Sequence, residues 1–320
     1  MTITQRRQTW LRRLALLCAA LVLAITSLSA FIRLSQAGLG CSDWPQCYGS
    51  RLRDAQQGHA TSVTDSAAVV AARLTHRVVA VTSLLLVIAM LVLCFGNRPF
   101  LLREGMLALA LLAFALVLAV LGRWSAGARV PAVAIGNLLG GLLMLALSWR
   151  LAARAAPPGD SALRSWARLG TAVLLIQVML GALLSASYAG LSCVGPMDCL
   201  RTAQAADWPW HALNPWREPV FDALQGATNP AGALVQLVHR GGALLTLLVL
   251  APLGVAALRG AHKRAGAALL GLLVIQIGVG VLMLIASLPL GLALAHNIVA
   301  ALLLATLVRL QCAPMNPENS

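Results

Sequence analysis

Two apolar segments of the chain each contain a histidine followed by an arginine, His76-Arg77 and His239-Arg240. A histidine inside a membrane-length helix is costly to place in hydrocarbon, so it indicates a functional site. Each following arginine can extend its guanidinium toward the membrane surface. There it could pair with a carboxylate in a bidentate fork or lie among lipid headgroups. The repetition of the pair suggests two related halves.

Four polar residues share one depth in their apolar segments, namely His76, Asn137, His239 and His296. Each lies about six to eight residues below the outer end of its segment, or roughly 9–12 Å at 1.5 Å per residue. Two inward-facing histidines at one depth can supply both axial ligands of a haem iron. We therefore predict that His239 and His296 hold one haem, with hydrogen-bonded structural histidines as the alternative.

The first half pairs His76 with Asn137 instead of a second histidine. Asparagine is a poor iron ligand, so an iron held by His76 would keep its second axial position open. An open position suits chemistry on a haem better than electron transfer through it. The two halves thus differ in what they could do.

The composition fits a protein with many membrane-spanning segments, because 59% of the 320 residues are hydrophobic and 11% are charged. About 20 apolar residues span the hydrocarbon as a helix. Long apolar runs also exclude a β-barrel, whose strands alternate. We predict an all-α fold with eight transmembrane helices as two pseudo-repeated four-helix bundles, residues 1–155 and 156–320. The predicted spans are 14–35, 69–95, 104–122, 131–149, 169–189, 231–258, 265–285 and 289–310.

The net charge of +14 does not indicate a nucleic-acid-binding protein, since the basic residues are distributed by side of the membrane. Most fall on the amino terminus and on short segments that alternate with longer, less basic loops. This is the positive-inside asymmetry, and it predicts a multi-pass protein of the bacterial inner membrane with both termini in the cytoplasm. The first apolar run is too long for a signal peptide, so we expect it to remain as a helix.

Two pairs of cysteines have equal spacing in the predicted outer loops, Cys41 with Cys47 and Cys193 with Cys199. The compartment outside the inner membrane permits disulfides, so we predict one disulfide within each loop. Free buried thiols are the alternative. A zinc site is less favoured, because each pair lacks a second close pair of ligands.

In these residues the chain resembles the haem A synthase family. The resemblance covers roughly residues 14–310 and is carried by the loop 37–47 (AGLGCSDWPQC), His76-Arg77, the run 137–141 (NLLGG), His239-Arg240 and His296. It implies an enzyme that oxidises the C8 methyl of haem O to a formyl group by successive hydroxylations, giving haem A for a terminal oxidase.

The resemblance also implies a haem b cofactor held by His239 and His296, and a haem O substrate near His76. A handover from the farnesyltransferase that makes haem O, and contact with oxidase assembly factors, are further expectations. The chain departs from the family pattern at two positions. Asn137 stands where a histidine is usual, and Arg73 stands where many members have a glutamate. Either His76 serves alone, which we favour, or the substrate site has changed.

Two other functions stay open on the sequence. A b-type membrane cytochrome could pass electrons from a quinol to a partner, but it would not require a second pocket poor in ligands. A transporter could be built on a parallel repeat. It would leave the histidines at matched depth without a purpose.

Overall fold

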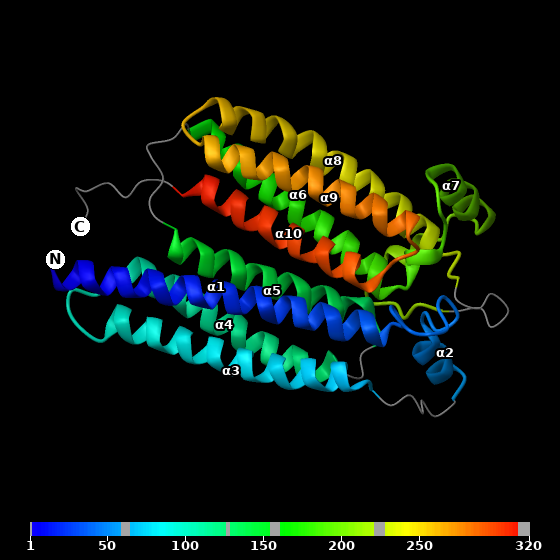
Figure 1. Ribbon diagram of the computed structural model, residues 1–320, viewed down its shortest axis with the longest axis horizontal. Coiled ribbons are helices and arrows are strands. Elements are labelled where there is room, and N and C mark those ends of the chain that lie inside the picture. Colours follow the sequence, from blue (N-terminus) through cyan, green and yellow to red (C-terminus); the bar gives the residue numbers. More distant parts are fainter. Residues whose placement is uncertain (1, 59–64, 126–128, 154–160, 221–227, 313–320) are drawn as a thin grey trace.

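The computed structural model describes residues 2–58, 65–125, 129–153, 161–220 and 228–312, and these are entirely helical and loop, with no strand. Eight helices are long and apolar enough to cross a membrane, which confirms the predicted all-α, eight-span fold. They lie side by side in Figure 1. Their bounds are α1 (Ile3–Gln36), α3 (Ala67–Phe95), α4 (Leu102–Ser125), α5 (Pro131–Ala152), α6 (Ser161–Ala186), α8 (Gly232–Arg259), α9 (Lys263–Ile285) and α10 (Leu290–Gln311).

The first four long helices close a ring in which α1 packs on α3, α3 on α4, α4 on α5 and α5 on α1. The last four close a second ring in the same order, from α6 through α8 and α9 to α10 and back to α6. Consequently α3 and α5 occupy opposite corners of the first ring, and α8 and α10 occupy opposite corners of the second. A parallel repeat would produce this shared packing order of helices in the two rings. The repeat itself stays a prediction. The predicted boundary at residue 155 lies outside the described residues.

The two rings meet through α5, which contacts α6 and α10, and through α1, which also contacts α10. Helices α5 and α10 are accordingly the most buried of the eight spans, and both lie in the middle of Figure 1. Leu303 and Leu307 of α10 are fully buried in the large apolar cluster that both rings share. Helices α3, α4 and α9 instead expose many large apolar side chains, as expected for surfaces that face lipid.

Two helices begin earlier than their apolar runs. Helix α1 starts at Ile3 instead of residue 14, because Thr2 and Gln5 form a capping box that extends the helix into a polar segment. Helix α6 starts at Ser161 instead of residue 169. Hydropathy detects the part of a helix that can lie in lipid, so it misses such polar extensions.

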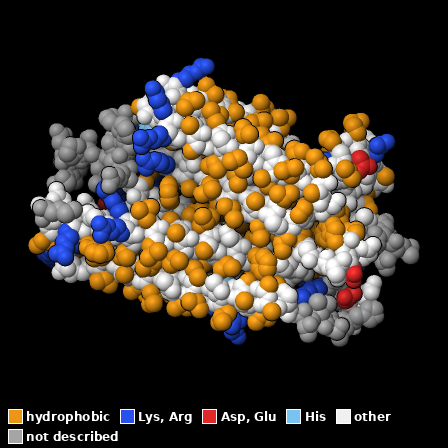
Figure 2. Space-filling view, viewed as in Figure 1, with side chains coloured by type: hydrophobic (Ala, Val, Ile, Leu, Met, Phe, Trp, Pro, Cys, Tyr) orange, Lys and Arg blue, Asp and Glu red, His pale blue; other side chains and the backbone are white. Residues whose placement is uncertain are grey.

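One end of the bundle carries the long loops, and we call it the loop end. It contains α2 (Ser50–Gln56), α7 (Pro196–Ala205), and the short 3₁₀ turns η1 (Ala189–Leu191) and η2 (Trp210–Leu213). Helix α1 begins and α10 ends at the opposite end, which we call the termini end (Figure 1). In Figure 2 the Lys and Arg side chains gather mainly at the termini end, while apolar side chains cover the middle of the molecule.

Candidate functional site

His239 of α8 is held by a glutamine from the neighbouring helix α6. Nε2 of Gln177 lies 3.1 Å from Nδ1 of His239 and also donates a hydrogen bond of 3.0 Å to the main-chain oxygen of that histidine. One helical turn further along α6, Gly181 faces the imidazole. A Cβ atom placed on Gly181 would approach Cε1 of His239 to 3.1 Å. A glycine at this position therefore allows the ring to lie close against α6.

His296 of α10 has an equivalent neighbourhood on α9. Nε2 of Gln276 lies 3.0 Å from Nε2 of the histidine. Gly280, again one turn further along, would place a Cβ atom 3.4 Å from Cε1 of His296. The two sites differ in which ring nitrogen the amide reaches, Nδ1 in His239 and Nε2 in His296.

The two histidines come from helices at opposite corners of the second ring, so both can face its interior. Counted from the first residue of each helix, His239 is seven residues into α8 (239 − 232) and His296 is six into α10 (296 − 290), so their depths match.

This arrangement fits a haem iron. It offers two imidazoles from opposite corners, the donor set of a six-coordinate haem. Nδ1 of His296 and the Oε1 atoms of Gln177 and Gln276 are buried without a hydrogen-bond partner in the described part of the chain. Unpaired buried polar atoms are uncommon in folded proteins and mark a place where a further partner belongs. Each histidine would supply one ring nitrogen to the iron.

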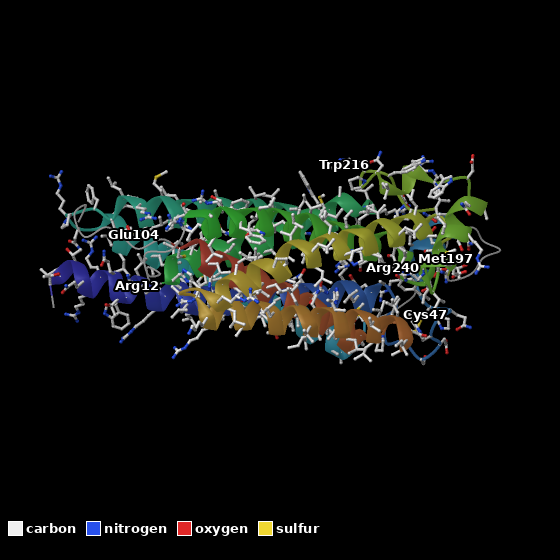
Figure 3. All side chains as sticks on the ribbon, turned by 90° about the horizontal axis from the view of Figure 1, so that it is seen from above. Arg12, Cys47, Glu104, Met197, Trp216 and Arg240 are labelled. Atoms are coloured by element: carbon white, nitrogen blue, oxygen red, sulfur yellow. A yellow bond between two sulfur atoms is a disulfide. The ribbon has the colours of Figure 1, made fainter. Side chains whose placement is uncertain are left out.

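Both predicted disulfides are present, Cys41–Cys47 after α1 and Cys193–Cys199 after α6. Arg240 reaches the second one. Its Nη1 donates to Sγ of Cys199 at 3.2 Å, and its Nη2 donates to the main-chain oxygen of Val194 at 3.0 Å. Figure 3 shows Arg240 and Cys47 near the loop end, with Arg12 and Glu104 near the termini end. Arg240 thus joins the outer part of α8 to the loop that the disulfide closes.

The candidate site of the first ring has fewer side-chain hydrogen bonds than that of the second. His76 on α3 and Asn137 on α5 also come from opposite corners, and neither side chain makes a hydrogen bond within the described part of the chain. Asn137 is six residues into α5 (137 − 131), whereas His76 is nine into α3 (76 − 67), because α3 begins at Ala67. Both are partly exposed, and Arg77 beside His76 is exposed.

Arg73 belongs to an ion-pair network at the start of α3. Its Nη1 lies 2.7 Å from Oδ2 of Asp65, and Nη2 of Arg51 lies 3.1 Å from Oδ1 of the same carboxylate. Asp65 therefore bridges α3 to α2. Arg73 has its own acidic partner, one that sequence reasoning did not identify.

Polar residues connect the two rings near the loop end. Arg33 of α1 donates to Oγ of Ser185 on α6, and the hydroxyl of Tyr48 accepts a hydrogen bond of 3.3 Å from the N–H of Gly190. The Tyr48 ring also packs edge-on against that of Tyr188, with centroids 5.6 Å apart. Burial raises the pKa of Tyr48 well above its usual value. The loop after α1 is in this way docked on the loop after α6.

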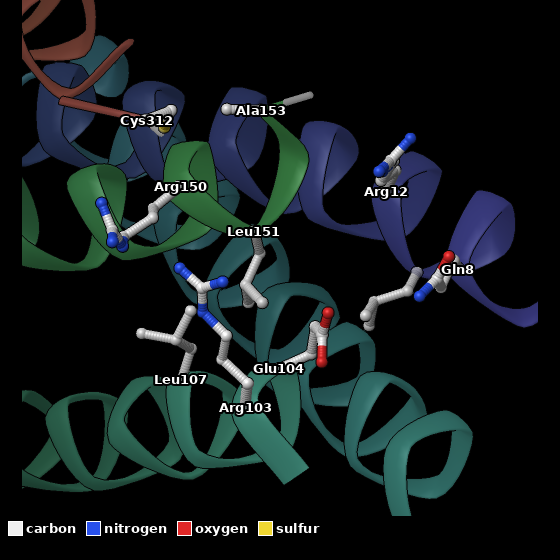
Figure 4. Close-up of a pocket in the computed structure, with 10 residues that line it drawn as sticks. Gln8, Arg12, Arg103, Glu104, Leu107, Arg150, Leu151, Ala153 and Cys312 are labelled. Atoms are coloured by element: carbon white, nitrogen blue, oxygen red, sulfur yellow. The ribbon is translucent and has the colours of Figure 1, made fainter. Parts of the chain in front are cut away.

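A pocket at the termini end is lined by basic side chains, among them Arg12, Arg103 and Arg150, with Glu104 nearby (Figure 4). It lies far along the bundle from Arg240, as Figure 3 shows. It is therefore separate from the histidine sites.

These features define a class, the multi-pass helical membrane proteins that place paired histidines inside a helix bundle. Comparison with known proteins makes this specific. The family model COX15-CtaA, described as cytochrome oxidase assembly protein, matches residues 12–308. The chain belongs to this family.

Two relatives are both named heme A synthase. The relative from Shewanella oneidensis is 33% identical over an alignment of 323 positions, gaps included, that covers 94% of each chain. That from Methylobacterium radiotolerans is 32% identical over 176 residues, covering 51% of this chain and 42% of the relative. The family that the sequence motifs suggested is therefore confirmed.

Sequence reasoning missed Gln177 and Gln276 as neighbours of the histidines. A signal was present, since each is the single glutamine of a long apolar segment and each is followed four residues later by a glycine. In a helix, residues four apart lie on one face. What the pattern alone does not contain is the rotation that aims this face at a histidine on another helix.

Proposed function

We propose that the protein is a haem A synthase, which oxidises the C8 methyl group of haem O to a formyl group for cytochrome oxidase assembly. The observation that carries this proposal is the match to a heme A synthase over 94% of both chains, with the same family model covering both rings. The reaction would replace a C–H bond by C–OH twice at one carbon, from methyl to hydroxymethyl to a gem-diol, and each replacement removes two electrons from the carbon that an external oxidant must take up. Loss of water from the gem-diol then gives the formyl group.

The second ring would hold haem b as the resident cofactor, with His239 and His296 as the residues that bind its iron. Bound there, haem b would supply one-electron transfer to the reaction. The guanidinium of Arg240 carries five N–H donors. Its Nη1 and Nη2 atoms each donate once, to Cys199 and to Val194. The remaining donors can pair with a propionate carboxylate. The disulfide Cys193–Cys199 would hold this arginine in place.

The first ring would bind the substrate, haem O. His76 would be the catalytic residue, as the single protein ligand of the substrate iron, and Arg77 would lie within reach of a propionate. Asn137 would face His76 from the opposite corner without ligating iron, which keeps one side of the substrate accessible. The apolar ring around the site excludes bulk water, so the hydroxylated intermediate is less exposed to side reactions.

The orientation that we propose places both termini in the cytoplasm of a bacterium, in the inner membrane, because the basic side chains gather at the termini end. Both disulfides then lie on the oxidising side of the membrane. Haem O would arrive from the farnesyltransferase that produces it, and haem A would pass to oxidase assembly factors. The lipid bilayer surrounds both rings, and no nucleic acid takes part.

The test is extraction and chromatography of haems from a host that makes haem O but no haem A, with and without this chain. The appearance of haem A would support the proposal. Unchanged haem O, with haem b still bound to the purified protein, would overturn it and favour a b-type cytochrome that only passes electrons.

A further inference from the structure

The sequence Gln-x-x-x-Gly occurs once on α6 and once on α9, as Gln177 with Gly181 and Gln276 with Gly280. Each helix lies beside a histidine-bearing helix, since α6 packs on α8 and α9 packs on α10. Within each pair, the glutamine amide contacts a ring nitrogen and the glycine faces Cε1 of the same imidazole. Each histidine thus has the same kind of neighbour, on the helix that precedes its own in the second four-helix ring.

Gln177 is itself tightly enclosed. It donates to the main-chain oxygen of His239, and a Cβ atom on Gly242 would collide with its Oε1. Glycine at 242 therefore allows the amide to lie against α8. The Nε2 atom of Gln177 is a hydrogen-bond donor, and it directs its N–H groups at Nδ1 and at the main-chain oxygen of His239. Oε1 of the same amide is buried without a partner in the described part of the chain.

We propose that the two Gln–Gly pairs are positioning elements, which set the orientation of the His239 and His296 imidazoles toward a haem iron. This inference rests on the proposed function, because it concerns the haem of the second ring. The glycines let each ring approach the neighbouring helix, and the amides restrict rotation of the ring. Side chains that orient a metal-binding histidine commonly change metal affinity about 10- to 100-fold.

The first ring lacks both elements. Helix α1 has no glutamine between Gln8 and Gln36, and α4 has none at all. His76 and Asn137 make no side-chain hydrogen bond in the described part of the chain. The contrast divides the molecule into a ring whose histidines are fixed and a ring whose histidine is free to adapt to a substrate.

The experiment uses the full-length protein with Gln177→Leu and with Gln276→Leu, which keep the side-chain volume close to that of glutamine. The matched control is Gln311→Leu. The Gln311 amide bonds Oγ1 of Thr171 at 2.6 Å, at the termini end and away from both histidines. The measurements are haem b per purified protein and the electron paramagnetic resonance spectrum of the oxidised haem.

We expect each leucine variant at residues 177 and 276 to retain haem b about 10-fold more weakly and to show altered resonance positions, with the control unchanged. The resonance positions respond to the orientation of the imidazole planes, so a loss of packing that leaves both imidazoles in place would not change them.

The glycines give an independent measurement. Gly181→Ala should alter the resonance spectrum more than Gly280→Ala. The Cβ atom added at residue 181 would lie 3.1 Å from the His239 imidazole, whereas the one added at residue 280 would lie 3.4 Å from the His296 imidazole. Wild-type spectra and haem retention in all four variants at residues 177, 181, 276 and 280 would overturn this inference and leave the proposed function intact. Wild-type protein purified without any haem b would count against the proposed second-ring site itself.

Discussion

The hydroxyl of Tyr48 accepts a hydrogen bond from the N–H of Gly190, although the two residues lie in loops 142 positions apart. Tyr48 follows α1 and Gly190 follows α6, so the bond joins the two rings at the loop end. Tyr48 is 3% exposed, and a Cβ atom on Gly190 would come within 3.0 Å of the hydroxyl oxygen. Glycine at 190 thus permits the close approach.

We expect Tyr48→Phe to lower the free energy of unfolding by about 1 kcal/mol, since it leaves the buried N–H of Gly190 without its partner. Thermal unfolding in detergent would measure the loss. Thr306→Val is a suitable control, because the hydroxyl of Thr306 donates to the main-chain oxygen of Leu302 in its own helix. Equal melting temperatures for wild type and Tyr48→Phe would show that this bond does not stabilise the joined rings.

The pKa of Tyr48 also predicts a pH dependence. Burial raises this pKa above the unfolded value of about 10, and the hydrogen bond from Gly190 and the charge of Arg33 oppose the shift only in part. The folded protein then keeps its proton where the unfolded chain has lost it. This contribution to stability is complete below pH 10 and is lost as the pH rises toward the folded pKa. Melting temperatures from pH 8 to 11 should therefore fall more steeply in wild type than in Tyr48→Phe. Parallel curves for the two proteins would show that the titration of Tyr48 does not affect stability.

His296→Ala should abolish stable binding of haem b, because the iron would keep a single protein ligand from the second ring. The reduced absorption spectrum and haem content of the purified protein would measure this. His262→Ala at the turn before α9 is the matched control, since His262 lies at the termini end of the molecule. Wild-type haem content in His296→Ala would exclude His296 as a ligand.

The helices could be predicted from sequence because each is a long apolar run, and the eight spans depend on little else. The two disulfides followed from equal spacing in loops. The matched depth of His239 and His296 could be counted from the sequence, with the two histidines expected on neighbouring helices. The structure instead places α8 and α10 at opposite corners of the second ring, because α6 and α9 pack between them. What depends on how helices rotate against one another was not predictable. The contact of Gln276 with His296 is an example.

Contacts between distant loops were also beyond the sequence. Nothing in the order of residues places Tyr48 against Gly190 or Arg33 against Ser185, because such contacts form only when the two rings pack together. The short helix α7 was missed because its ten residues are not apolar as a group, and short helices depend on tertiary packing. The ion pair of Arg73 with Asp65 similarly required the loop geometry before α3.

Asn137→His tests the open side of the first ring. The Asn137 amide has no hydrogen-bond partner in the described part of the chain, so its replacement should leave membrane expression unchanged. The new imidazole would face His76 from the opposite corner and could close the second axial position of the substrate iron. We expect more haem O retained by the purified protein and less haem A formed. Complete loss of expression would instead mean that Asn137 packs within the core.

The most direct test of the division of labour between the rings compares wild type with His76→Ala in a host that makes haem O but no haem A. Haems would be extracted and separated, and haem b would be measured in the purified proteins. The account predicts haem A from wild type and only haem O from His76→Ala, with haem b equal in both. Haem A at the wild-type level from His76→Ala would contradict it, because the reaction would then not depend on the histidine of the first ring.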